Sequence, residues 1–178
     1  MKFKQINYKS APVFITVLLG SLLLLLSSTQ AVADMFSFFK KYDVHLCPEV
    51  HGQITLEGKP IPNLEVIRGL TYGDDDELVD KAMTDEQGRF LFPEKNIRSR
   101  KPGSMFDESR RRQTIGVVHR GQQYVLWYTQ SIGIEANKNL TDKLNYLNCD
   151  LNNSEEKIKI KNHEYPQGNH LIHSICRW

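Results

Sequence analysis

The sequence lacks the features that identify several classes of protein. It has no Gly-x-Ser-x-Gly elbow, no His-Glu-x-x-His pair and no glycine-rich phosphate loop, so no motif supports an enzyme or a cofactor. It has no internal repeat and no long linker. It also lacks the basic excess of a general nucleic-acid binder: beyond residue 33 it holds 20 Lys and Arg against 21 Asp and Glu, a net charge of −1. We therefore expect no nucleic-acid partner.

Long apolar runs are absent except for residues 11–28, which follow three lysines. This run, with the small residues Ala31 and Ala33, predicts a secretory signal peptide over residues 1–33, cleaved after Ala33. The alternative is an uncleaved membrane anchor, because about 18 apolar residues approach a spanning length. No cysteine lies at the junction, so a lipid anchor is not expected. We expect an exported protein, periplasmic or secreted, with a lead-in at 34–43 and one domain at 44–178.

Cysteines are few: Cys47, Cys149 and Cys176. In an oxidising compartment three cysteines indicate one disulfide and one free thiol, with three possible pairings. We favour Cys149 with Cys176, because closing that loop would pin a terminal strand and stabilise the fold by about 3 kcal/mol. Cys47 is then either a small buried side chain or an intermolecular link, and we favour the buried interpretation.

Alternating apolar and polar residues predict an all-β fold. The stretch from Thr84 to Phe92 indicates a hairpin that turns at Gly88 and buries Phe90 and Phe92 on one face. Val66 and Trp127 are further expected core residues. The other predicted elements are strands near 52–56 and 64–68, a hairpin of 114–119 with 124–129, one short helix near 139–147, a lysine-protected edge strand at 157–161 and a last strand at 170–176. Together they predict an antiparallel β-sandwich.

Three motifs, Gly52-x-Ile54, Gly58-Lys59-Pro60-Ile61-Pro62-Asn63-Leu64-x-Val66 and Thr84-Asp85-Glu86-Gln87-Gly88-Arg89-Phe90-x-Phe92, occur in this order. They resemble the carboxypeptidase regulatory-like domains over about residues 44–93. The resemblance implies a transthyretin-like (prealbumin-like) sandwich and a role as stalk, plug or binding module, with no catalytic residue to carry over. The remainder, with RKPGSMFDESRRR and YVLWY, resembles short exported bacterial proteins of uncharacterised function.

The segment 95–112 is the candidate binding site, because it combines basic and unpatterned apolar side chains, and arginine and aromatic residues dominate interface hot spots. We expect the acidic run 74–77 to offset only its first part and to leave 110–112 for an acidic partner. A solvated loop is the alternative. The predicted partner-binding residues are Arg98, Arg100, Lys101, Met105, Phe106, Arg110, Arg111 and Arg112.

Two groups of residues could bind a metal ion, but each lacks part of the required pattern. The run 74–77 offers carboxylates for calcium but lacks the glycine and distal glutamate of an EF-hand. His170, His173 and Cys176 would share one face only of a helix, whereas a strand is predicted there. We therefore expect no metal site.

The leading functional hypothesis is an exported, non-enzymatic interaction or structural module with a protein partner in the cell envelope. It would meet the membrane only through an uncleaved signal segment. The first alternative is a periplasmic immunity or inhibitor protein that neutralises a toxin or hydrolase. The second, a small envelope hydrolase, has no motif in its favour.

Overall fold

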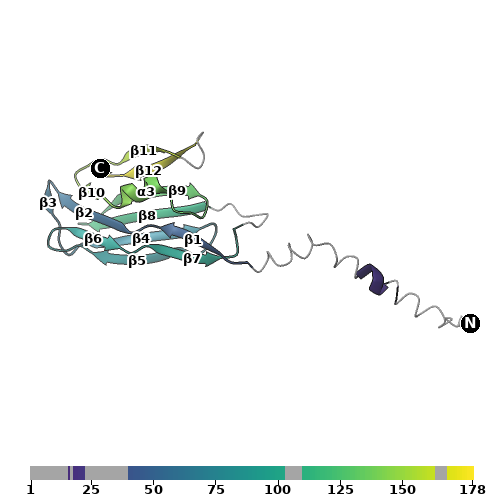
Figure 1. Cartoon of the computed structure of the whole chain (residues 1–178). Coiled ribbons are helices and arrows are strands. Elements are labelled where there is room, and N and C mark those ends of the chain that lie inside the picture. The colour runs from purple at the N-terminus through teal and green to yellow at the C-terminus, as the bar shows by residue number, and fades with distance from the viewer. Residues whose placement is uncertain (1–15, 17, 23–39, 103–109, 163–167) are drawn as a thin grey trace, which may run out of the picture. The chain divides into compact units, whose positions relative to one another are not determined.

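The computed structural model describes residues 16, 18–22, 40–102, 110–162 and 168–178 of the chain (Figure 1). The chain divides into two units, Met1–Lys40 and Lys41–Trp178. In the first unit, residues 16 and 18–22 belong to a short exposed helical stretch. No helix within the described ranges is long and apolar enough to cross a membrane. The rest of the predicted signal peptide and most of the lead-in lie outside the described residues.

The second unit contains a six-stranded antiparallel sheet in the order β11-β12-β9-β8-β4-β5. Long alternating strands form its centre, and lysines line the exposed face of the edge strand β11, as predicted. Its strands are β4 (Glu65–Tyr72), β5 (Leu78–Met83), β8 (Arg110–His119), β9 (Gln122–Ile132), β11 (Glu156–Lys161) and β12 (Asn169–Ser174).

A second sheet has five strands, in the order β13-β10-β2, with both β3 and β6 paired to β2. The pair β10–β2 is parallel, which departs from a purely antiparallel sandwich. A parallel pair needs a long crossover, and here the chain between the two strands includes the β8–β9 hairpin and the helix that follows it. The strands are β2 (Val50–Leu56), β3 (Lys59–Pro60), β6 (Arg89–Phe92), β10 (Leu147–Asp150) and β13 (Cys176–Arg177).

A two-stranded ribbon of β1 (Tyr42–Cys47) and β7 (Lys95–Ser99) continues the β2–β6 pair along the chain. Cys47 pairs with Lys95 and Val50 with Phe92, so Pro48 and Pro93 fall in the gap between the two ladders. Proline has no N–H to donate to a ladder. The two prolines therefore account for the break between the ribbon and the five-stranded sheet.

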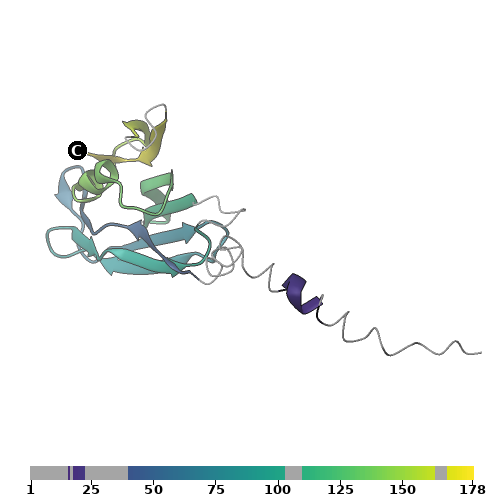
Figure 2. The ribbon, with the colours of Figure 1, turned by 45° about the vertical axis from the view of Figure 1, so that its right-hand side comes forward.

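The two sheets pack into an all-β sandwich around one core (Figures 1 and 2). Phe90 and Phe92 from one sheet and Val66 and Trp127 from the other are all at most 4% exposed, as predicted. Burying such side chains supplies most of the driving force for folding.

The predicted helix is α3 (Lys138–Leu144), which begins after the N-cap Asn137 and ends before the predicted limit. Its Leu140 and Leu144 are buried. Both ribbon views show α3 on the same side as the β11–β12 hairpin (Figures 1 and 2), where the Asn139 amide donates to the Lys161 carbonyl.

The predicted hairpin at Thr84–Phe92 is wrong. β5 pairs with β4, and β6 pairs with β2, so the turn crosses from one sheet to the other. The Thr84 hydroxyl explains this path, because it donates to the Ile61 carbonyl at 2.7 Å and accepts from the Leu64 N–H at 2.8 Å. These bonds tie the end of β5 to the chain entering β4 and direct the following residues across the core.

The turn itself is as predicted in its local chemistry. Gly88 has a φ of 70°, and a Cβ there would lie 2.4 Å from the Ile54 carbonyl oxygen, so only glycine fits. The Asp85 carboxylate accepts from the backbone N–H groups of Gln87 and Arg89. The turn is therefore predicted correctly, but the two strands that it connects belong to different sheets.

Candidate interaction site

The structure places the predicted partner-binding residues on several elements. Arg98 lies on β7, 3.3 Å from Asp43, and Arg100 is exposed. The Lys101 Nζ lies 2.7 Å from an Asp75 carboxylate oxygen. Arg110 and Arg112 are exposed on β8. Met105 and Phe106 lie outside the described residues.

Arg111 does not belong to an exposed surface, and this part of the prediction is wrong. Its side chain is 2% exposed and donates to the carbonyls of His45 and Glu135 at 2.7 and 2.6 Å. The residues after it already carried the signal, because Gln113 and Ile115 occupy the same face of an alternating strand. Predicting a loop for this segment hides the signal, because alternation has no meaning in a loop.

The outer face of the six-stranded sheet carries an apolar depression of about 250 Å³. We call it the outer trough, and its main residues are Ile67, Gly69, Val79, Gly116 and Val118. Gly69 on β4 and Gly116 on β8 provide its floor, since neither adds a side chain to the sheet surface. The walls are exposed valines: Val79 is 56% and Val118 50% exposed.

Glu77 closes one end of the outer trough. A Cβ on Gly69 would lie 2.5 Å from the Glu77 Oε1, so the carboxylate lies over that glycine. The same oxygen is 4.0 Å from the Arg112 Nη2. Arg112, predicted to be uncompensated, therefore has an acidic neighbour. A larger residue at position 69 would displace the Glu77 carboxylate.

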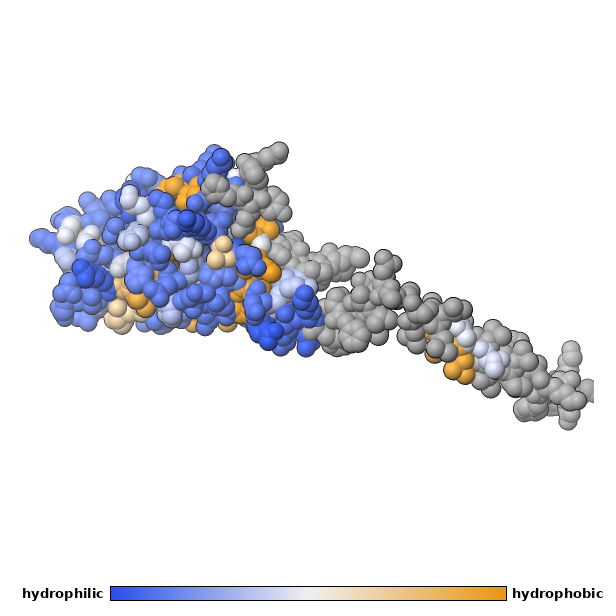
Figure 3. All heavy atoms as spheres, viewed as in Figure 1, coloured by the Kyte–Doolittle hydropathy of each residue, from blue (hydrophilic) through white to orange (hydrophobic). Residues whose placement is uncertain are grey.

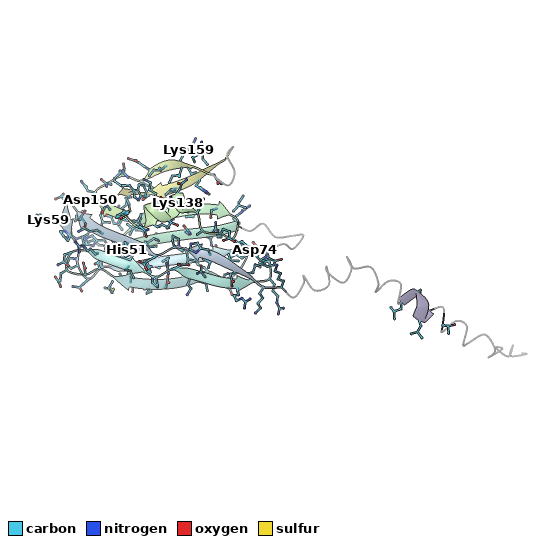
Figure 4. The ribbon with its side chains drawn as sticks, in the orientation of Figure 1. His51, Lys59, Asp74, Lys138, Asp150 and Lys159 are labelled. Carbon is cyan, nitrogen blue, oxygen red and sulfur yellow. A yellow bond between two sulfur atoms is a disulfide. The ribbon has the colours of Figure 1, made fainter. Side chains whose placement is uncertain are left out.

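Beyond this ion pair lies a small polar cleft of about 190 Å³. It is lined by the β4–β5 turn and by β8 and β9, through Thr71, Gly73, Asp74, Arg110, Arg112 and Gln130. Asp74 is labelled in Figure 4, at the end of the domain where β1 and β7 lie. The acidic run and the basic segment thus meet, as expected, although the contacts are Asp75 with Lys101 and Glu77 with Arg112.

The residues proposed for zinc are otherwise engaged. Cys149 and Cys176 form the predicted disulfide, with their Cα atoms 4.0 Å apart. His170 is buried beside the Asn137 amide, and His173 lies 3.0 Å from the Glu155 carboxylate. Across the described ranges, no cluster of three His, Cys, Asp or Glu side chains is placed to hold a metal ion.

Cys47 is free and buried, as predicted. Burial raises the pKa of its thiol to about 11, and the nearby Arg68 charge offsets only part of that effect. A thiol with such a pKa is protonated at neutral pH and a weak nucleophile. Cys47 is therefore a packing residue.

The family model of a domain of unknown function, DUF6795, matches residues 50–154. No curated protein and no solved structure matches the chain. The resemblance to carboxypeptidase regulatory-like domains stays a prediction. The matched span runs from β2 to the end of β10 and contains the whole outer trough. Since it covers more than half of the sequence, the chain belongs to the DUF6795 family.

Proposed function

We propose that this chain is an exported, non-enzymatic interaction module that binds a protein partner through the outer trough. The observation that carries the proposal is the trough itself: exposed Val79 and Val118 beside a glycine floor. Interfaces combine an apolar centre with a polar rim, and the outer trough has this arrangement, with Glu77 and Arg112 at one end. A disulfide and the apolar leader sequence support export, since disulfides persist in oxidising compartments.

The partner is expected to place an apolar side chain in the outer trough and a carboxylate beside Arg110 and Arg112. The ion pair of Glu77 with Arg112 is long, at 4.0 Å, and the arginine side chain remains 44% exposed. An incoming carboxylate can therefore compete for its guanidinium, and arginine is well suited to such contacts. A toxin or hydrolase blocked by this surface would make the protein an inhibitor, and the same site would serve.

The test uses the tagged protein as bait in an envelope extract from its own source, with two matched variants. Val118→Glu places a charge in the outer trough. Leu91→Glu places the same charge on β6 of the other sheet, at a side chain that is also 50% exposed. The proposal requires a protein captured by the wild type and by Leu91→Glu, and lost with Val118→Glu.

Both variants must keep the thermal midpoint of the wild type, because both replace half-exposed side chains. Capture that is equal for all three baits, or lost equally with both variants, would overturn the outer trough as the binding site. The captured protein is then purified, and its direct binding to the wild type and both variants is measured.

A further inference from the structure

A second depression, of about 700 Å³, lies on the five-stranded sheet where β2 meets β6 and β10. We call it the polar groove. It is built by separate segments: His51 and Gln53 from β2, Arg89 from β6, and Asn145, Tyr146 and Asn148 around the start of β10. His51 marks the β2 side in Figure 4, and the face turned to the viewer in Figure 3 is mainly hydrophilic.

Three side-chain amides lie in the polar groove. The Gln53 Nε2 donates to the Gln87 carbonyl at 2.9 Å, which fixes that side chain and leaves its carbonyl oxygen as an acceptor. The side chain of Asn145 is half-buried and that of Asn148 is exposed, so both amides can reach a ligand in the groove. An amide both donates and accepts hydrogen bonds, as does a hydroxyl group. Three amides in one groove therefore match a ligand rich in hydroxyls.

Tyr146 contributes an aromatic surface to the same groove. Its side chain is 70% exposed, the largest value among the exposed large apolar side chains of the sandwich. A tyrosine side chain has a broad ring face and a polar hydroxyl tip, so the ring can cover the C–H face of a sugar while neighbouring amides bind the hydroxyls.

The charges in the polar groove favour a neutral ligand. Arg89 is a cation, whereas Glu49 and His51 form a hydrogen-bonded pair in which the carboxylate is satisfied locally. A polyanion would meet the Glu49 charge, and a cation would meet Arg89. Neither sign of charge dominates.

A peptide that adds as a strand does not fit this place. β2 is paired on one side with β6, through Gly52 with Phe90 and Gln53 with Arg89. It is paired on the other side with β10, through Gly52 with Leu147 and Gln53 with Asn148. With both of its edges occupied, β2 has no ladder positions to offer to such a peptide.

We propose that the polar groove binds a neutral oligosaccharide, with one sugar ring stacked on Tyr146 and its hydroxyls bonded to Gln53, Asn145 and Asn148. This site is on the other sheet from the outer trough and does not rest on the proposed function. It would allow an envelope protein to hold a glycan while the opposite sheet faces a protein.

The test is calorimetric titration of the purified protein with three neutral tetrasaccharides: cellotetraose, maltotetraose and the tetramer of N-acetylglucosamine. At least one should bind with a dissociation constant below about 1 mM. Tyr146→Ala should weaken that binding by about tenfold or more, and Tyr146→Phe, which keeps the ring, by less than about threefold. Asn148→Ala should also weaken it.

Val118→Glu, in the outer trough, is the control and should bind the sugar as the wild type does. The proposal fails if none of the three sugars binds with a dissociation constant below about 1 mM, or if Tyr146→Ala binds as tightly as the wild type. It also fails if Tyr146→Ala abolishes capture of the protein partner while sugar binding is unchanged. Near-identical thermal midpoints show that the variants are folded.

Discussion

At the scale of single residues, buried polar side chains join the six-stranded sheet to the β1–β7 ribbon. Gln113 on β8 donates to the Leu46 carbonyl on β1 and accepts from the Trp127 indole N–H. Arg111, two positions earlier, reaches the same ribbon through the His45 carbonyl. Buried polar groups are costly unless they are hydrogen-bonded, so these contacts fix how the ribbon lies on the six-stranded sheet.

Arg68 is a further buried polar residue, and its charged side chain is 0% exposed. It donates Nε and Nη2 to the two Asp80 carboxylate oxygens at 2.9 and 2.6 Å, and Nη1 to the Pro93 carbonyl at 2.9 Å. Its guanidinium also lies 4.7 Å from the centre of the Phe92 ring. A strand position that alternation assigned to the core is thus filled by a charge.

We predict that Asp80→Ala lowers the free energy of unfolding by about 3 kcal/mol, because it leaves the Arg68 charge buried without its counter-ion. Adding Arg68→Met should recover a large part of that loss, since an apolar side chain of similar length needs no partner. Urea unfolding of the wild type, both single variants and the double variant measures this coupling. Additive losses would show that the two side chains are not coupled.

At the scale of elements, Asp150 ties β10 to the turn between β2 and β3. Its carboxylate accepts from the Thr55 hydroxyl at 2.9 Å and from the Gly58 and Asn152 N–H groups at 2.7 and 2.9 Å. Partial burial acts to raise the pKa of Asp150, but these hydrogen bonds outweigh it and lower the pKa below its usual value of 3.8. The fold therefore favours the ionised form.

This shift predicts a pH-dependent stability. A carboxyl group whose pKa is lowered by folding stabilises the protein above its unfolded pKa, and the benefit is lost as the pH falls through its folded pKa. The wild type should exceed Asp150→Asn in unfolding free energy by the most at neutral pH. The difference should shrink below about pH 4, which urea titrations at a series of pH values would measure. A difference independent of pH would exclude this role.

The sequence predicted individual elements better than their pairing. Alternation located the β8–β9 hairpin, and Leu140 and Leu144 located the helix, because those signals are local. The route after Thr84 depends on hydrogen bonds to Ile61 and Leu64, about twenty positions away, which no local pattern encodes. The same limit applies to the site: the outer trough needs Gly69 and Gly116 from two paired strands.

At the scale of the whole molecule, the candidate sites lie on different sheets and have different chemistry. The outer trough is apolar with charges at one end, whereas the polar groove is lined by amides and one exposed aromatic ring. The core between the sheets is packed with buried side chains such as Trp127 and Phe92. Variants at one site should therefore leave the other unchanged, which makes each the control for the other.

The division of charged and apolar groups in the outer trough also predicts the kinetics of partner binding. Arg110 and Arg112 are exposed at its end, so Arg110→Glu and Arg112→Glu should slow association with the acidic partner, more at low than at high salt. Val118→Ala should instead speed dissociation by about tenfold, because a buried apolar contact is made only in the complex. Surface plasmon resonance with the captured partner separates the two rates. An Arg112→Glu effect confined to dissociation, or one insensitive to salt, would place that arginine inside the contact instead of beside it.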